Sequence, residues 1–150
     1  MYSLTLDDIP SIAAFLDSGA VKLGAGVGKE RMTPLHYASA QGNFELVEFL
    51  LERKAKVLAK DKYKRSPLVH AVKNGHVKLA SLLLQKGADW NQSDSSQNYP
   101  LHYAAGYGWK ESIDLLIDHD AYLNVINMCK ATPITVAMLK NHTGIVKKLV

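Results

Sequence analysis

The sequence predicts an all-α protein built as a solenoid of stacked helix pairs, and three observations point to this fold. The segment Thr33–Ala38 (TPLHYA) returns in related form three more times, with the prolines of the four copies at residues 34, 67, 100 and 133, a period of 33. A fixed period of roughly 20–50 residues is typical of repeat arrays. Apolar residues at helical spacing follow each copy, and a glycine or asparagine separates the two helical stretches.

Each copy of the motif is expected to begin a short helix. Pro34 suits a first helical turn because its missing N–H removes a donor that would have no partner there. The hydroxyl of Thr33 can cap the same turn. In the fourth copy Asn141 replaces the turn glycine, and asparagine is the usual second choice for a left-handed backbone. The expected helix pairs are Pro34–Gln41 with Phe44–Arg53, Pro67–Asn74 with Val77–Lys86, and Pro100–Tyr107 with Lys110–His119.

The period divides residues 1–150, as a single domain, into repeats of unequal completeness. Ile12, Phe15 and Leu16 are spaced as one helical face, so we expect an N-terminal half-repeat that caps the stack. The last helix stops inside its expected length, which leaves Ile145 and Leu149, with Val146 and Val150, partly uncovered. Terminal repeats normally carry a polar outer face, so we expect either a longer parent chain or a partner over that end. The repeats are 1–27, 28–60, 61–93, 94–126 and 127–150.

Composition indicates a soluble, intracellular protein of the cytoplasm or nucleus. Hydrophobic residues make up 47% of the chain and charged residues 21%, which is ordinary for a globular domain. No apolar run approaches the roughly 20 residues that span a membrane, and the N-terminus has no signal-peptide pattern. The single cysteine, Cys129, cannot form an internal disulfide, which fits a reducing compartment.

The motif and its period resemble those of ankyrin repeats over essentially the whole chain. Gly87–Asn91 (GADWN) closely resembles the helix-ending segment of that family. The resemblance implies antiparallel helix pairs, stacked side by side, with hairpin loops projecting from them. The family usually has glycine two residues before the Thr-Pro pair, so either the turn changes shape here or long side chains are wanted at the loop tips. The residues that replace this glycine are Arg31, Lys64, Gln97 and Lys130.

The resemblance also implies a binding surface on the concave face and the hairpin tips. We add two residues to the family's contact positions: Lys64, which lies in a run of basic residues, and Trp109, a large aromatic residue in a turn. The alternative for Trp109 is that its side chain folds back onto the helix pair. The predicted contact residues are Lys29, Met32, Gln41, Lys62, Tyr63, Lys64, Arg65, Lys73, Asn98, Tyr107, Trp109 and Met128.

Charge is distributed unevenly along the chain, whose net charge is +4. From Arg53 to Arg65 seven cations are opposed only by Asp61, a local excess of +6. The outer helix of the third repeat is instead acidic. Opposed zones of charge favour steered association, so we expect a protein or peptide partner with an acidic segment. The alternative is that the basic run is only a solvated edge.

The sequence contains no constellation that predicts catalysis, a metal or a cofactor. The six histidines lack paired ligand spacing, and no phosphate loop or nucleophile motif is present. His36 and His102 are expected to form hydrogen bonds within their own motifs, and His70 to be a satisfied core group rather than a pH switch. Trp90 is expected to pack. Asn91 resembles asparagines that are hydroxylated in some ankyrin repeats, with a hydrogen bond to the hairpin backbone as the favoured alternative.

The sequence therefore predicts a non-catalytic module that binds a partner protein or peptide. The alternative is a targeting or regulatory segment of a larger enzyme, for example one like the poly(ADP-ribose) polymerases. Nucleic acid is disfavoured, because the acidic third repeat would repel phosphate and only Tyr63 lies among the cations. No membrane contact is expected. The oligomeric state is left open, with a monomer expected.

Overall fold

The computed structural model describes residue 26 and residues 29–149, and regular structure in this part of the chain is helical. The predicted all-α repeat fold is confirmed. Four helices end one residue earlier than expected because Arg53, Asn74, Lys86 and His119 serve as C-caps. The helices are α2 (Pro34–Gln41), α3 (Phe44–Glu52), α4 (Pro67–Lys73), α5 (Val77–Gln85), α6 (Pro100–Tyr107), α7 (Lys110–Asp118), α8 (Pro133–Leu139) and α9 (Thr143–Leu149).

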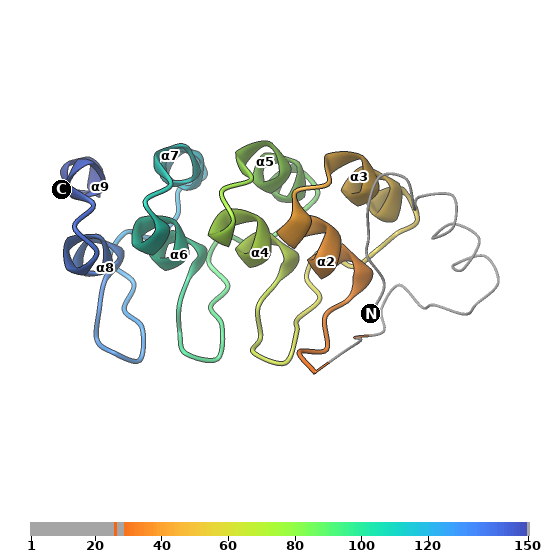
Figure 1. The fold of residues 1–150 in the computed structure, drawn as a ribbon, viewed down its shortest axis with the longest axis horizontal. Helices are drawn as coiled ribbons and strands as arrows, with labels where there is room; N and C mark the ends of the chain where they lie inside the picture. The colour runs from red at the N-terminus through yellow and green to blue at the C-terminus, as the bar shows by residue number, and fades with distance from the viewer. Residues whose placement is uncertain (1–25, 27–28, 150) are drawn as a thin grey trace.

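The helices form two rows, with long loops projecting from one of them (Figure 1). The inner row holds α2, α4, α6 and α8, each packed against the next, and the outer row holds α3, α5, α7 and α9. The core lies between the rows, where Leu50, Leu83 and Leu116 are fully buried at equivalent positions of successive repeats. The predicted half-repeat, residues 1–27, lies outside the described residues except for Gly26.

Histidine rings of the motif join each repeat to the next. The Nδ1 atom of His36 accepts the N–H of Thr33 at 3.1 Å, while its Nε2 lies 2.8 Å from the carbonyl of Arg65 in the following repeat. His102 repeats this arrangement, with Nε2 2.9 Å from the carbonyl of Ala131. The expected hydrogen bonds within the motif are confirmed, and the structure adds this bond between repeats.

A second series of rings joins repeats in the opposite direction. The ring nitrogens of His76, Trp109 and His142 each reach a backbone carbonyl 36 residues earlier, at 3.2, 3.0 and 3.1 Å. A Cβ atom added at Gly75 would lie 2.9 Å from the ring of Trp109, so the indole rests directly on that turn. Trp109 therefore folds back onto the preceding repeat, which is the alternative raised from the sequence; it is still 37% exposed, and its role as a contact stays a prediction.

The hairpin tips keep the left-handed backbone for which glycine is usual. Of the two alternatives raised by the missing glycines, a changed turn is therefore wrong. An L-residue in this conformation costs roughly 1–2 kcal/mol, so long side chains are held at the tips at the expense of stability. The φ angles are +54° at Arg31, +61° at Lys64, +60° at Gln97 and +62° at Lys130.

Neighbouring hairpin tips are bound to one another through their backbones. The N–H of Lys62 donates to the carbonyl of Glu30 at 2.7 Å, and the N–H of Ser95 donates to the carbonyl of Tyr63 at 2.9 Å. The same bond recurs one repeat later, where Met128 donates to Ser96 at 3.0 Å. The tips therefore form one connected strip rather than four separate loops.

The apolar surface of the last repeat agrees with the expectation at Val146 and Leu149 and differs from it at Ile145, while Val150 lies outside the described residues. Ile145 is buried, because it belongs to the core that the preceding repeat completes, while Val146 and Leu149 are half-buried. Among the described residues of this repeat, the exposed large apolar side chains are Met128, Met138 and Leu139, which are 66%, 59% and 75% exposed.

Candidate partner-binding surface

The predicted contact residues lie on what we call the inner surface, which consists of the helices α2, α4, α6 and α8 and the projecting hairpins (Figure 1). The hairpin before α4, residues Lys60–Arg65, is called the basic hairpin. Its three lysines, Lys60, Lys62 and Lys64, are all exposed, and no carboxylate pairs with them among the described residues. These lysines therefore present uncompensated positive charge to solvent.

Arg65, the fourth cation of the basic hairpin, is part of its internal structure. Its Nε donates to Asp61 Oδ2 at 2.8 Å, and its Nη2 donates to Glu30 Oε2 at 3.0 Å. The side chain of Arg65 is only 12% exposed. Arg65 therefore presents little free charge, because two carboxylates already hold its guanidinium, and its role as a contact residue stays a prediction.

Asp61 organises the base of the basic hairpin. Its Oδ1 accepts the backbone N–H groups of Tyr63 and Arg65, both at 2.9 Å, and its side chain is fully buried. Burial by itself raises the pKa of this carboxyl, but the hydrogen bonds from Arg65 and His70 outweigh it and hold the pKa below its usual value. Asp61 is therefore a charged, buried anchor and not merely an opposing surface charge.

Tyr63 stands at the tip between two cations. The guanidinium of Arg65 lies 4.9 Å from the centre of its ring, and the ammonium of Lys62 lies 5.8 Å from it. Cation–π contacts of this kind are worth about 0.5–1 kcal/mol at exposed sites. They orient the phenol ring, which remains 42% exposed and available to a partner.

His70 lies beneath the basic hairpin and contacts its anchor. Its Nε2–H donates to Asp61 Oδ2 at 3.1 Å, and its ring stands perpendicular to that of His36 at 5.4 Å between centres. Burial lowers the pKa of His70 to about 4, and burial also lowers the pKa of His36. The expectation of a satisfied core histidine is confirmed, since the neutral ring has both a partner and a dry environment.

These histidines predict that acid destabilises the fold. Between about pH 6.5 and pH 4 the unfolded chain binds a proton at His70 that the native protein does not, so stability falls as the pH falls. The lowered pKa values of His36 and His102 act in the same direction. We expect the free energy of unfolding, from urea titrations at pH 7 and pH 4.5, to fall by about 2–3 kcal/mol.

The third repeat supplies a matched control for this pH dependence. Tyr103 occupies the position of His70 one period later and donates its hydroxyl to Asp94, the counterpart of Asp61. His70→Tyr should therefore keep a donor to Asp61 while removing the titrating ring, and it should reduce the loss of stability at pH 4.5. An unchanged loss in this variant would show that His70 is not its source.

Farther along the inner surface, a groove of about 330 Å³ lies between α6 and α8. Two predicted contact residues, Asn98 and Tyr107, line it, and Tyr107 is 51% exposed. Lys140, at the end of α8, lines the same groove. The inner surface therefore offers two features, the basic hairpin and this groove.

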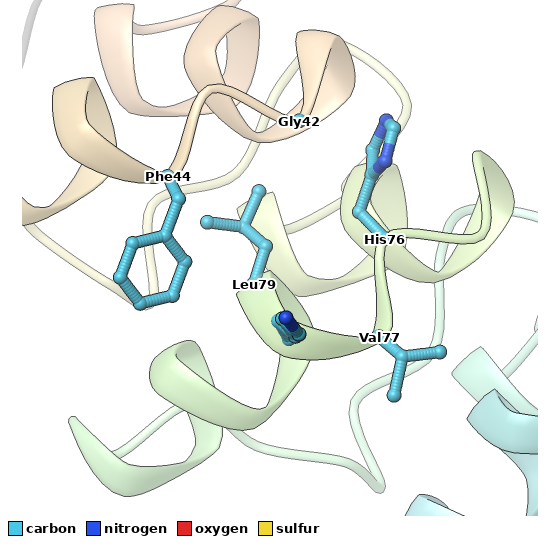
Figure 2. A pocket seen from close by; sticks show the side chains of 6 residues that line it. Gly42, Phe44, His76, Val77 and Leu79 are labelled. Atoms are coloured by element: carbon cyan, nitrogen blue, oxygen red, sulfur yellow. The ribbon is translucent and has the colours of Figure 1, made fainter.

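A wider groove of about 590 Å³ lies on the other side of the molecule, between α3 and α5. Figure 2 shows the side chains of Phe44 and Leu79 facing this space, with His76 at its edge. The ring of His76 is already engaged with the carbonyl of Ala40. None of the predicted contact residues lines this groove.

Comparison with protein families agrees with the fold. A family model described as ankyrin repeats (3 copies) matches residues 10–94 and 89–150. The chain belongs to the ankyrin-repeat family. Ankyrin repeats are in general protein–protein interaction modules and are typically non-catalytic. A search of curated proteins found no match to the chain.

Within the ankyrin domain, the predicted contact residues differ in how much surface they present. Met32 directly precedes the capping residue of α2 and is only 7% exposed, so it presents little surface, and its role as a contact stays a prediction. Arg65, Lys73 and Asn98 are half-buried. The exposed members are Lys29, Gln41, Lys62, Tyr63, Lys64, Tyr107, Trp109 and Met128.

Two polar residues of the groove between α6 and α8, Asn127 and Lys140, are not among the contact residues predicted from the sequence. Lys140 lies 33 residues after Tyr107, and Asn127 lies 33 residues after Asp94. The same repeat alignment that selected Gln41 and Tyr107 could have selected Lys140. Asn127 carries no such signal, because its role depends on a contact with Asn98 that only the folded chain creates.

Asn91 has backbone partners in the structure. Its side-chain oxygen accepts the N–H of Tyr122 at 3.3 Å, and its own N–H donates to Asp89 at 2.9 Å. These bonds agree with the favoured alternative of a hydrogen-bonding role. Hydroxylation of Asn91 stays a prediction.

Among residues 26 and 29–149, no group of three or more histidine, cysteine or carboxylate side chains is placed to hold a metal ion. In the same part of the chain, no helix has the length and apolarity needed to cross a membrane.

Proposed function

We propose that this ankyrin domain binds an acidic segment of a partner protein through its basic hairpin and inner surface. The observation that carries the proposal is the set of three exposed lysines, Lys60, Lys62 and Lys64, which have no carboxylate partner among the described residues. Each exposed ion pair that they form is worth only about 0.2–1 kcal/mol. Several such pairs made together give useful affinity and accelerate association.

The rigidity of the hairpin supports this proposal. Asp61 holds the loop from inside through two backbone N–H groups, and the tip is bonded to both neighbouring tips. A partner therefore meets lysines that stand on an ordered backbone. Little conformational entropy is lost on binding when the receptor is already ordered.

The pattern of charge along the tips favours a protein over a nucleic acid. The tip after the basic hairpin consists of Ser95, Ser96 and Gln97, so the row of cations is interrupted there. A groove that follows a phosphate backbone needs continuous positive charge. The acidic residues of α7, which disfavoured nucleic acid in the sequence, lie in the outer row. They therefore play no part in the choice between a protein and a nucleic acid.

Reversing two charges tests the proposal. We expect Lys62→Glu with Lys64→Glu to weaken binding of a fluorescein-labelled peptide that contains a run of glutamates by at least about tenfold, mainly through slower association. Arg65 must be left intact, because its pairing with Asp61 is part of the fold. Fluorescence anisotropy gives the affinity and stopped-flow mixing gives the association rate.

The matched control carries the same change of charge on the other row. Lys78 and Lys86 are exposed residues of α5 and its C-cap, so Lys78→Glu with Lys86→Glu alters net charge equally. We expect this control to bind within about twofold of the wild type at physiological salt, where distant charges are screened. Equal losses in both variants would contradict a specific role for the basic hairpin. Tighter binding of a single-stranded oligonucleotide than of the peptide would instead identify a nucleic-acid site.

A further inference from the structure

The groove between α6 and α8 contains one side-chain amide, the N–H₂ group of Asn98, that has no protein acceptor among the described residues. Asn127 Oδ1 accepts the N–H groups of Cys129 and Ala131, at 2.9 and 3.0 Å. Its amide nitrogen must therefore be the atom that faces Asn98, and it donates to Asn98 Oδ1 at 2.9 Å. This fixes the orientation of Asn98 as well, so its own N–H₂ group is directed away from Asn127. No acceptor for that N–H₂ group is found among the described residues.

No carboxylate of the described chain lines this groove, although the buried Asp94 accepts the N–H of Asn98 and the hydroxyl of Tyr103, two of its lining residues. Asn127 stands where the two preceding repeats have Asp61 and Asp94, and it makes the same bonds to the hairpin backbone. The amide therefore preserves the turn while removing the charge. Lys140 adds a positive charge at the rim, and it pairs with no carboxylate in the described chain.

The groove also has room for a side chain. Gly106 lines it without a side chain, where the equivalent positions hold Ala40, Lys73 and Leu139; α6 and α8 approach closely there, since an added Cβ would lie 3.1 Å from Val136. Tyr107 forms an exposed aromatic wall. A volume of about 330 Å³ accommodates one side chain of a peptide laid over the inner surface.

We propose that this groove binds the carboxylate of an aspartate or glutamate side chain of the partner, between the N–H₂ group of Asn98 and the ammonium of Lys140. This inference rests on the proposed function, since the carboxylate belongs to the same acidic segment that the basic hairpin attracts. One cation and one neutral amide match a singly charged carboxylate. A phosphate carries about two charges and is usually held by several cations or by arginine.

A double-mutant cycle tests the pocket. The probe is a peptide that carries a run of glutamates for the basic hairpin, then a flexible spacer, then one single glutamate, and its C-terminus is amidated. Peptides with several spacer lengths are compared. At the best spacer length, replacing that glutamate by glutamine should weaken binding to the wild type about fivefold. The same replacement should have little effect on Lys140→Met. Lys86→Met, a lysine replaced at the C-cap of α5, is the control and should retain the wild-type difference.

A second measurement separates failure of the pocket from failure of the hairpin. A short peptide with a single glutamate, titrated into ¹⁵N-labelled protein, should shift the side-chain N–H₂ signals of Asn98 in the wild type and not in Lys140→Met. Shifts at Asn98 together with no effect of the hairpin reversal would support the pocket and refute the proposed hairpin function. If replacing the glutamate of the probe by glutamine weakens binding equally in the wild type and in Lys140→Met, and the Asn98 signals do not shift, the proposed pocket is overturned. A phosphoserine peptide that binds tighter than the glutamate peptide would overturn the assignment to a carboxylate.

Discussion

Asp61→Ala is expected to lower the free energy of unfolding by about 3–5 kcal/mol, the largest effect of any single change in the basic hairpin. The carboxylate is buried and serves Arg65 Nε, His70 Nε2 and two backbone N–H groups. Its removal leaves the guanidinium half-paired and the buried donors without an acceptor. Urea denaturation at pH 7, followed by circular dichroism, measures the loss.

The fourth repeat supplies the control for this prediction. Asn127 makes the equivalent backbone bonds without a charge. Asp61→Asn should therefore keep the two backbone bonds while its N–H₂ group replaces the oxygen that Arg65 and His70 use, so it loses the ion pair and those two acceptor contacts and costs less than Asp61→Ala. If alanine and asparagine have equal effects below about 1 kcal/mol, Asp61 does not anchor the hairpin in the way its contacts indicate.

Leu83→Ala is expected to cost about 2–5 kcal/mol, and Leu50→Ala a loss in the same range. Both side chains are fully buried at equivalent positions of α5 and α3, within the continuous core between the rows. Each substitution leaves a cavity in the core between the two rows of helices, which the neighbouring repeats can fill only in part. Chemical denaturation of the purified variants gives the difference directly.

Leu58→Ala is the matched control for core burial. Leu58 is 53% exposed, so the same truncation removes little buried surface and should cost less than about 0.5 kcal/mol. Losses under about 1 kcal/mol at both Leu83 and Leu50 would be incompatible with the packing between rows.

The fold could be predicted because its information is local and repeated. Pro34 and its three counterparts each begin an inner helix, and the residue after each turn begins an outer one. The repeat spacing then determines which helices become neighbours. Four helices end one residue before their predicted ends, because Arg53 and its counterparts bond to the last turn as C-caps without extending the helix.

The candidate site could be predicted only in part, because stacking brings together residues that are distant in sequence. In the sequence Arg65 is one cation among seven, and only the folded chain brings it into contact with Glu30, 35 residues earlier. Trp109 left two alternatives open, since the direction of its ring depends on the preceding turn at Gly75. The free amide of Asn98 likewise depends on Asn127, in the next repeat.

The most direct test of the account is a map of peptide contacts on ¹⁵N-labelled protein. Titration with the glutamate-run peptide should shift backbone amide signals of Lys62, Tyr63 and Lys64 first, with smaller shifts along the neighbouring tips and near Tyr107. The amides of α5 and α7 in the outer row should remain unchanged. Shifts concentrated on the outer row, or around Phe44 in the groove between α3 and α5, would contradict recognition through the basic hairpin and the inner surface.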